Sequence, residues 1–122
     1  MKNTLAIAYL GDAVYELFIR EHLINSGIKD VNDLQKMSLD FVSAKSQRLH
    51  LERLLNDNFL TEEEIDLVKH GRNIKGRKNK NSDIITYRLS TGLEYLCGYL
   101  YLNNKKNRFE EIMNYIVGGT KC

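Results

Sequence analysis

The sequence contains no proline, no regular alternation of apolar and polar residues, and no Asn-Gly turn. Because such features mark the strands and turns of βαβ and barrel folds, their absence argues against both architectures. The two cysteines, Cys97 in an apolar run and Cys122 at the last position, form neither a disulfide framework nor a zinc-ligand spacing. We therefore expect a protein of a reducing cytosol.

Long uncharged stretches are also missing. Asp12 and Glu94 interrupt the two main apolar segments, so neither reaches the roughly 20 residues that a membrane-spanning helix needs. The short apolar segment behind Lys2 resembles a weak signal peptide, but Asp12 stands where a small-residue cleavage site should begin. The chain of 122 residues, 43% of them apolar, therefore predicts a single cytoplasmic domain with no membrane association.

Positive charge is concentrated in one stretch. Lys69 to Lys80 holds six Lys and Arg residues and no acid, which leaves 12 basic against 16 acidic residues elsewhere, a net charge of −4. Gly71, Gly76 and the neighbouring asparagines argue against a helix, so we expect a flexible loop able to follow a phosphate backbone. The alternative is a solvated connection without a ligand.

Apolar residues recur at helical spacing almost everywhere else, as Leu10, Val14, Leu17 and Ile24 show in the first segment. The pattern predicts an all-α domain of about six helices. We expect helix boundaries at Gly27, Asn32 with Gln35, Ser38, Thr61 with Glu64, Gly71, Ser82, Asn107 with Glu110, and Gly118.

Two acids stand out because each interrupts an apolar helix. Asp12 follows Gly11 among apolar and aromatic residues, and Glu94 lies between two glycines in a similar setting. An isolated buried carboxylate costs many kcal/mol unless a cation or hydrogen bonds compensate it. One interpretation is a core ion pair with Arg20 or Arg88, and the other is a functional site.

A magnesium site accounts for both acids together with the basic stretch. Hard divalent cations prefer carboxylate oxygens, and phosphodiester hydrolysis uses a metal ion to activate water and stabilise the leaving oxygen. Other chemistries lack support, since no G-x-S-x-G and no phosphate-binding glycine loop is present. The histidines form no metal-ligand motif, and we expect surface or packing roles for His22, His50 and His70.

Several motifs in order resemble the ribonuclease III family. Tyr9–Glu16 resembles its signature E-F-L-G-D-A-V-L-E, and Leu93–Leu102 resembles its second motif, E-A-L-I-G-A-L-Y-L. The segments Val42–Gln47, Gly71–Asn73 and Asn81–Thr91 resemble the short branch, the Mini-ribonuclease III enzymes. The likeness spans nearly the whole chain.

This resemblance implies an all-helical endonuclease domain over residues 1–122, a homodimer, Mg²⁺ dependence and cleavage of double-stranded RNA. In the short branch it implies maturation of the 23S (large-subunit) ribosomal RNA precursor, with ribosomal proteins on that precursor as possible further partners. By position, Asp12 and Glu94 become the metal-binding catalytic carboxylates, and Tyr9 falls at the dimer interface.

Two departures from the larger enzymes bear on the metal site. Where those enzymes carry two more acids, this chain has Ala8 and Thr91, so water or RNA phosphate oxygens must complete the coordination of any second metal.

The larger enzymes also append a double-stranded RNA-binding domain, which we do not expect here, and a lead-in before Asp12 could be missing. RNA affinity must then come from Lys45, Gln47, Arg72, Asn73, Lys75, Arg77, Lys78 and Lys80.

Two other functions stay open on the residues. Ala8 and Thr91 would suit a non-catalytic helical dimer that binds RNA, although retention of Asp12 and Glu94 argues against it, because acids repel phosphate. A nucleotide pyrophosphohydrolase could use the acidic cluster Glu62, Glu63, Glu64 and Asp66, but acids in the first turn of a capped helix are also favoured by the helix dipole.

Overall fold

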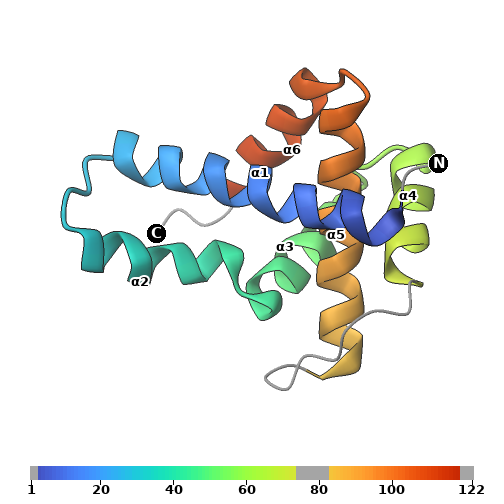
Figure 1. The fold of residues 1–122 in the computed structure, drawn as a ribbon, viewed down its shortest axis with the longest axis horizontal. Helices are drawn as coiled ribbons and strands as arrows, with labels where there is room; N and C mark the ends of the chain where they lie inside the picture. The colour runs from blue at the N-terminus through green and yellow to red at the C-terminus, as the bar shows by residue number, and fades with distance from the viewer. Residues whose placement is uncertain (1–2, 74–82, 119–122) are drawn as a thin grey trace.

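The computed structural model describes residues 3–73 and 83–118, and within these ranges every regular element is a helix (Figure 1). The predicted all-α fold is confirmed. In chain order the helices are α1 (Thr4–Asn25), α2 (Val31–Val42), α3 (Ala44–Asn56), α4 (Glu62–Arg72), α5 (Ile84–Leu102) and α6 (Lys106–Gly118).

Two of the expected helix boundaries are formed as predicted. Gly27, at φ 97°, follows α1, and the amides of Gly27 and Ile28 donate to the carbonyls of Ile24 and Leu23 in a Schellman motif. At the start of α4, the Thr61 hydroxyl accepts from the Glu64 amide while the Glu64 carboxylate accepts from the Thr61 amide, which completes the capping box.

Other boundaries were wrong by several residues, because nearby side chains compete for the capping position. Asp30 caps α2 ahead of Asn32, and Ser43 caps α3. Ser38 lies inside α2, where its hydroxyl donates to the Gln35 carbonyl. Two smaller shifts occur: α5 is capped by Asp83, with Ser82 outside the described residues, and Asn107 lies in the first turn of α6.

Helix α5 runs through the centre of the domain, with α1 crossing it and α3 and α4 packed alongside (Figure 1). This position explains why α5 is apolar on nearly every side. The fully buried core joins α1, α3, α5 and α6 through Tyr15, Ile19, Leu51, Leu54, Leu93, Leu96, Ile112 and Ile116.

Glycines let α1 and α5 touch backbone to backbone. A Cβ on Gly11 would overlap the carbonyl oxygen of Glu94, and a Cβ on Gly98 would overlap the carbonyl oxygen of Ile7. The unusual glycine beside Asp12 is thus required by close approach of the two helices, which outweighs its intrinsic cost of about 1 kcal/mol in a helix.

Not every residue of the expected apolar faces is buried. Leu17 and Ile24 of α1 are 58% and 57% exposed, and Leu49 and Ile85 are also more than half exposed. Exposed apolar side chains of this kind leave surfaces free to meet another molecule.

In ranges 3–73 and 83–118, no helix combines the length and apolar character needed to cross a bilayer.

Candidate active site

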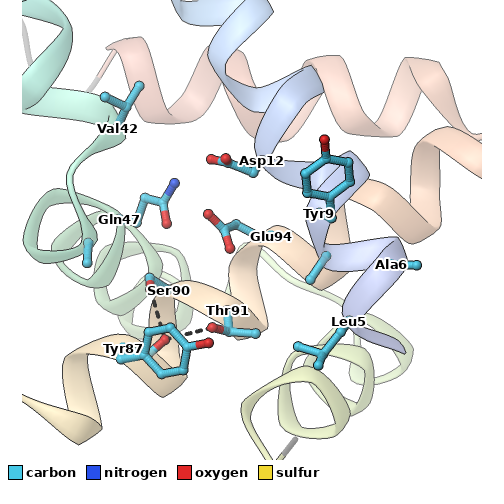
Figure 2. A pocket seen from close by; sticks show the side chains of 12 residues that line it. Leu5, Ala6, Tyr9, Asp12, Val42, Gln47, Tyr87, Ser90, Thr91 and Glu94 are labelled. Carbon is cyan, nitrogen blue, oxygen red and sulfur yellow. Dashed lines mark hydrogen bonds between the residues drawn. The ribbon is translucent and has the colours of Figure 1, made fainter. Parts of the chain in front are cut away.

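The α1–α5 crossing brings together the two acids that interrupt the apolar helices. Asp12 comes from the middle of α1 and Glu94 from the middle of α5, and their carboxyl groups lie side by side in the lining of a pocket of about 560 Å³ (Figure 2). Gln47 of α3 and Thr91 of α5 also line this pocket. Because Gly11 packs directly on the backbone of Glu94, the positions of the two acids are linked.

Electrostatics in the pocket penalise two negative charges. Burial, the charge of Asp12 and a hydrogen bond with Asp12 raise the pKa of Glu94 to about 8, while a hydrogen bond from Gln47 works in the opposite direction. At neutral pH without an external cation, Glu94 therefore tends to keep its proton. A bound cation would remove this penalty and favour two carboxylates.

The alternative of internal ion pairs is not realised. Arg20 pairs instead with Glu16 at the surface, at 3.6 Å, and Arg88 is exposed. Among the ion pairs of the described residues, none involves Asp12 or Glu94. The two acids lack a counter-charge from the described part of their own chain.

The donor set fits a hard divalent cation. Two adjacent carboxylates supply oxygen ligands, and Mg²⁺ commonly takes only one or two carboxylates from the protein while keeping several waters. Residues 3–73 and 83–118 contain no group of three or more metal-ligating side chains, so Asp12 and Glu94 would be its acidic ligands. The pocket leaves space for water and a phosphate group.

Both departures from the acidic pattern of the larger enzymes lie at this pocket. Ala8 is 3% exposed and Thr91 is 6% exposed, and both are lining residues. The hydroxyls of Ser90 and Thr91 donate to the carbonyl oxygen of Tyr87 at 2.8 and 2.9 Å (Figure 2). These side chains contribute polar surface without further negative charge.

The other predicted site residues occupy several places. Tyr9 is 78% exposed at the pocket. Lys45 is exposed on the first turn of α3, whereas Gln47 is only 2% exposed, which favours contact with Glu94 over contact with RNA. Arg72 ends α4 and Asn73 follows as its C-cap, so the predicted loop was wrong for residues 69–72, where Gly71 lets the helix pack closely on α5. The predicted RNA-binding residues Lys75, Arg77, Lys78 and Lys80 lie outside the described residues.

The acidic cluster that could have indicated a pyrophosphohydrolase is a structural feature of α4. Glu64 belongs to the capping box and accepts from Arg108 of α6 at 2.7 and 2.8 Å. Glu62 and Glu63 lie beside it in the first turn, where the helix dipole favours acids. Neither they nor Asp66 line the pocket of Asp12 and Glu94.

The histidines have packing roles, as expected. His50 is buried against Phe41, its Nε2 lies 3.0 Å from the Asp40 carbonyl, and Arg53 donates to its Nδ1 at 3.2 Å. Burial lowers the pKa of His50, so the ring is neutral at pH 7. His70 contacts Thr4 and Tyr95, and His22 packs edge-on against Phe41.

Two residues of the site were not singled out from the sequence. Tyr87 and Ser90 line the pocket together with Thr91 and Glu94. Their numbers differ by three, four and seven, the spacing of one helical face. The sequence therefore contained the information to find them once Glu94 was placed in a site.

Comparison with known proteins identifies related chains over nearly the whole length. The ribonuclease III domain model matches residues 5–105. Mini-ribonuclease 3 from Enterococcus faecalis is 45% identical over 116 residues, 94% of this chain and 88% of the relative. The Staphylococcus aureus protein of the same name is 41% identical, over 94% and 87%. A crystal structure of a Fusobacterium nucleatum protein has a TM-score of 0.83 at 32% identity, covering 98% of this chain and 94% of that one.

Proposed function

Since the chain belongs to the ribonuclease III domain family and is an endoribonuclease of that type, we propose that it cleaves double-stranded RNA at the pocket of Asp12 and Glu94. The observation that carries this assignment is the pairing of two partly buried acids with no cation of the described chain beside them. An ion pair needed only for folding would have its counter-charge within the protein.

In the proposed reaction, water attacks the phosphorus, and the bond from phosphorus to the 3′ oxygen breaks. Mg²⁺, when bound, supplies activation of the water and stabilisation of the leaving oxygen. Asp12 and Glu94 hold the ion. The glycine contact between their helices keeps the main chains of both acids in place. The products carry a 5′ phosphate and a 3′ hydroxyl.

The proposal includes a homodimer. Leu5 and Tyr9, on the first turns of α1, are 38% and 78% exposed although both are large and apolar or aromatic. Both lie at the pocket, so a second copy bound there would cover apolar surface close to the acids. Each subunit would then place one active site along a shared RNA-binding surface.

RNA binding in the proposal relies on phosphate contacts. Lys45 and Arg72 lie within the described helices, and the basic residues from Lys75 to Lys80 add charge beyond them. The deep, narrow major groove of A-form RNA prevents base reading, so we expect recognition by shape and backbone. The proposed physiological substrate is the 23S ribosomal RNA precursor in the bacterial cytoplasm, with ribosomal proteins as possible partners.

The test is incubation of purified protein with 23S precursor RNA, followed by mapping of product ends. We expect discrete cleavage in double-stranded regions with 5′ phosphates, loss of activity with a chelator, and recovery on addition of Mg²⁺. Asp12→Asn should remove activity, whereas Glu110→Gln, an exposed acid of α6, should not. Cleavage that persists in Asp12→Asn would contradict the site, and single-stranded products only would contradict the substrate class.

A further inference from the structure

Gln47 is a polar side chain in an unusual position. It lies in the first turns of α3 and is 2% exposed, which places it among the most completely buried side chains of the described core. A buried amide is stable only when its donors and acceptors find partners. Its partners therefore indicate what the side chain does.

The backbone at Gln47 is held by a well-formed helix start. Ser43 accepts from the Ser46 amide at 3.1 Å, and the Gln47 amide donates to the Ser43 carbonyl at 2.9 Å. The Ser46 hydroxyl also donates to the Leu39 carbonyl of α2 at 2.9 Å. These bonds fix the direction in which the Gln47 side chain leaves α3.

From this position the side chain reaches the acids. Figure 2 shows the Gln47 amide beside the carboxyl groups of Asp12 and Glu94, at the wall of the pocket. At this place the amide favours the ionised carboxyl group of Glu94 and acts to lower its pKa. Gln47 is thus a neutral donor placed against an acid whose other close neighbour is a second acid.

We propose that Gln47 is a positioning residue of this site, whose amide holds the Glu94 carboxylate turned toward Asp12 so that both can bind one divalent cation. The inference deepens the proposed function and rests on it. Groups that hydrogen-bond to metal ligands typically change metal affinity or activity by 10- to 100-fold when removed. A residue that only filled the core would change stability alone.

The experiment replaces Gln47 by methionine, which has similar volume but no amide donor. Mg²⁺ binding to the RNA-free protein is measured by calorimetry, and cleavage is measured across a range of Mg²⁺ concentrations. We expect Gln47→Met to bind Mg²⁺ about 10-fold more weakly. Its activity should return at high Mg²⁺, with an unchanged KM for duplex RNA.

Two further variants separate positioning from folding. Ile112→Val removes one buried methyl group in α6 and should lower the unfolding midpoint without changing Mg²⁺ affinity. Gln47→Asn keeps the amide but withdraws it by one methylene, so it should also weaken Mg²⁺ binding. It provides the same measurement if the methionine variant does not fold.

The outcomes are distinct. Wild-type Mg²⁺ affinity in a folded Gln47 variant would overturn the positioning role while leaving the proposed function intact. A raised KM for RNA with unchanged Mg²⁺ affinity would also overturn it and would favour RNA contact instead. If the wild-type protein neither bound Mg²⁺ nor cleaved duplex RNA, the proposed function itself would fail.

Discussion

Glu64 is buried and Glu94 is partly buried, but the surroundings of the two acids differ. Glu64, 5% exposed, meets the Arg108 guanidinium at 2.7 and 2.8 Å. Burial acts to raise the pKa of Glu64, but Arg108 and the capping bonds with Thr61 lower it overall. Glu94 meets Asp12 instead, and burial together with that second acid raises its pKa to about 8.

The contrast separates an acid that serves the fold from one that we propose serves a ligand. The Glu64 site is complete within the chain, since Arg108 also donates to the Phe59 carbonyl at 2.7 Å and ties α6 to α4. Ionisation of both Glu94 and Asp12 is unfavourable within the described chain, and a cation from outside would offset that cost. Buried acids can therefore be assigned by asking where their counter-charge comes from.

The largest expected effect follows removal of the unpaired charge. Glu94→Gln should lower kcat/KM for duplex RNA by roughly 1,000-fold, equivalent to about 4 kcal/mol of transition-state stabilisation. The same change should raise the metal-free free energy of unfolding at pH 8, because repulsion from Asp12 disappears. Cleavage assays and urea unfolding measure the two effects, and a variant that was both active and less stable would break the contrast.

Breaking the pair of Glu64 and Arg108 should lower stability and leave activity unchanged. Arg108→Met leaves Glu64 buried without its cation and should lower the free energy of unfolding by about 3 kcal/mol. The activity of the folded fraction should stay unchanged. Lys105→Met, which removes the cation of an exposed pair with Glu63 at 3.4 Å, is the matched control and should cost less than about 1 kcal/mol.

The two acids should also give opposite pH dependence. The pKa of Glu94 is raised from 4.5 to about 8, so metal-free stability should fall as pH rises through this interval, by up to about 1.4 kcal/mol per pH unit. The pKa of Glu64 is lowered, so its contribution is present above the unfolded value and lost in more acidic solution. Urea unfolding from pH 4 to 9 measures both trends. Glu94→Gln should flatten the alkaline trend, and a wild-type profile rising toward pH 8 would contradict it.

A smaller effect is expected from the capping box that holds Glu64 at the start of α4. Thr61→Ala removes the hydroxyl that accepts from the Glu64 amide at 3.1 Å and should cost about 1 kcal/mol. Cleavage and Mg²⁺ affinity should not change, because α4's capping box is no part of the pocket. Thermal unfolding with and without Mg²⁺ checks both statements, and loss of the Mg²⁺-induced shift would show that the two regions are coupled.

Local rules and motifs predicted much of this molecule. The helical spacing gave the fold class, Thr61 with Glu64 gave a boundary, and the odd placement of Asp12 and Glu94 led to the pocket. The fold class and this boundary were confirmed because each depends on residues a few positions apart, whereas the catalytic role of Asp12 and Glu94 stays a prediction. The helix starts at Asp30 and Ser43 were missed because several nearby polar residues could have served as caps.

Long-range partners were beyond such rules. The pairing of Glu64 with Arg108 joins residues 44 positions apart, and no local pattern marks it. The inward direction of Gln47 was missed for the same reason, since a single amide in a polar helix start reads as a surface residue. Leu17 and Ile24 show the opposite error: they are apolar residues at helical spacing, but they are exposed in the folded domain.

At Gly11 and Gly98, α1 and α5 contact each other through main-chain atoms. No side chain lies between the helices there, so none can rotate to change their spacing. The separation of the Asp12 and Glu94 main chains is therefore fixed, so the two side chains must share an ion across a set distance. Mg²⁺ requires short, nearly octahedral bonds, whereas Ca²⁺ takes longer bonds and more ligands. A fixed spacing between the two helices favours ions of one radius. We therefore expect Ca²⁺ to bind in the pocket but to support slower RNA cleavage than Mg²⁺.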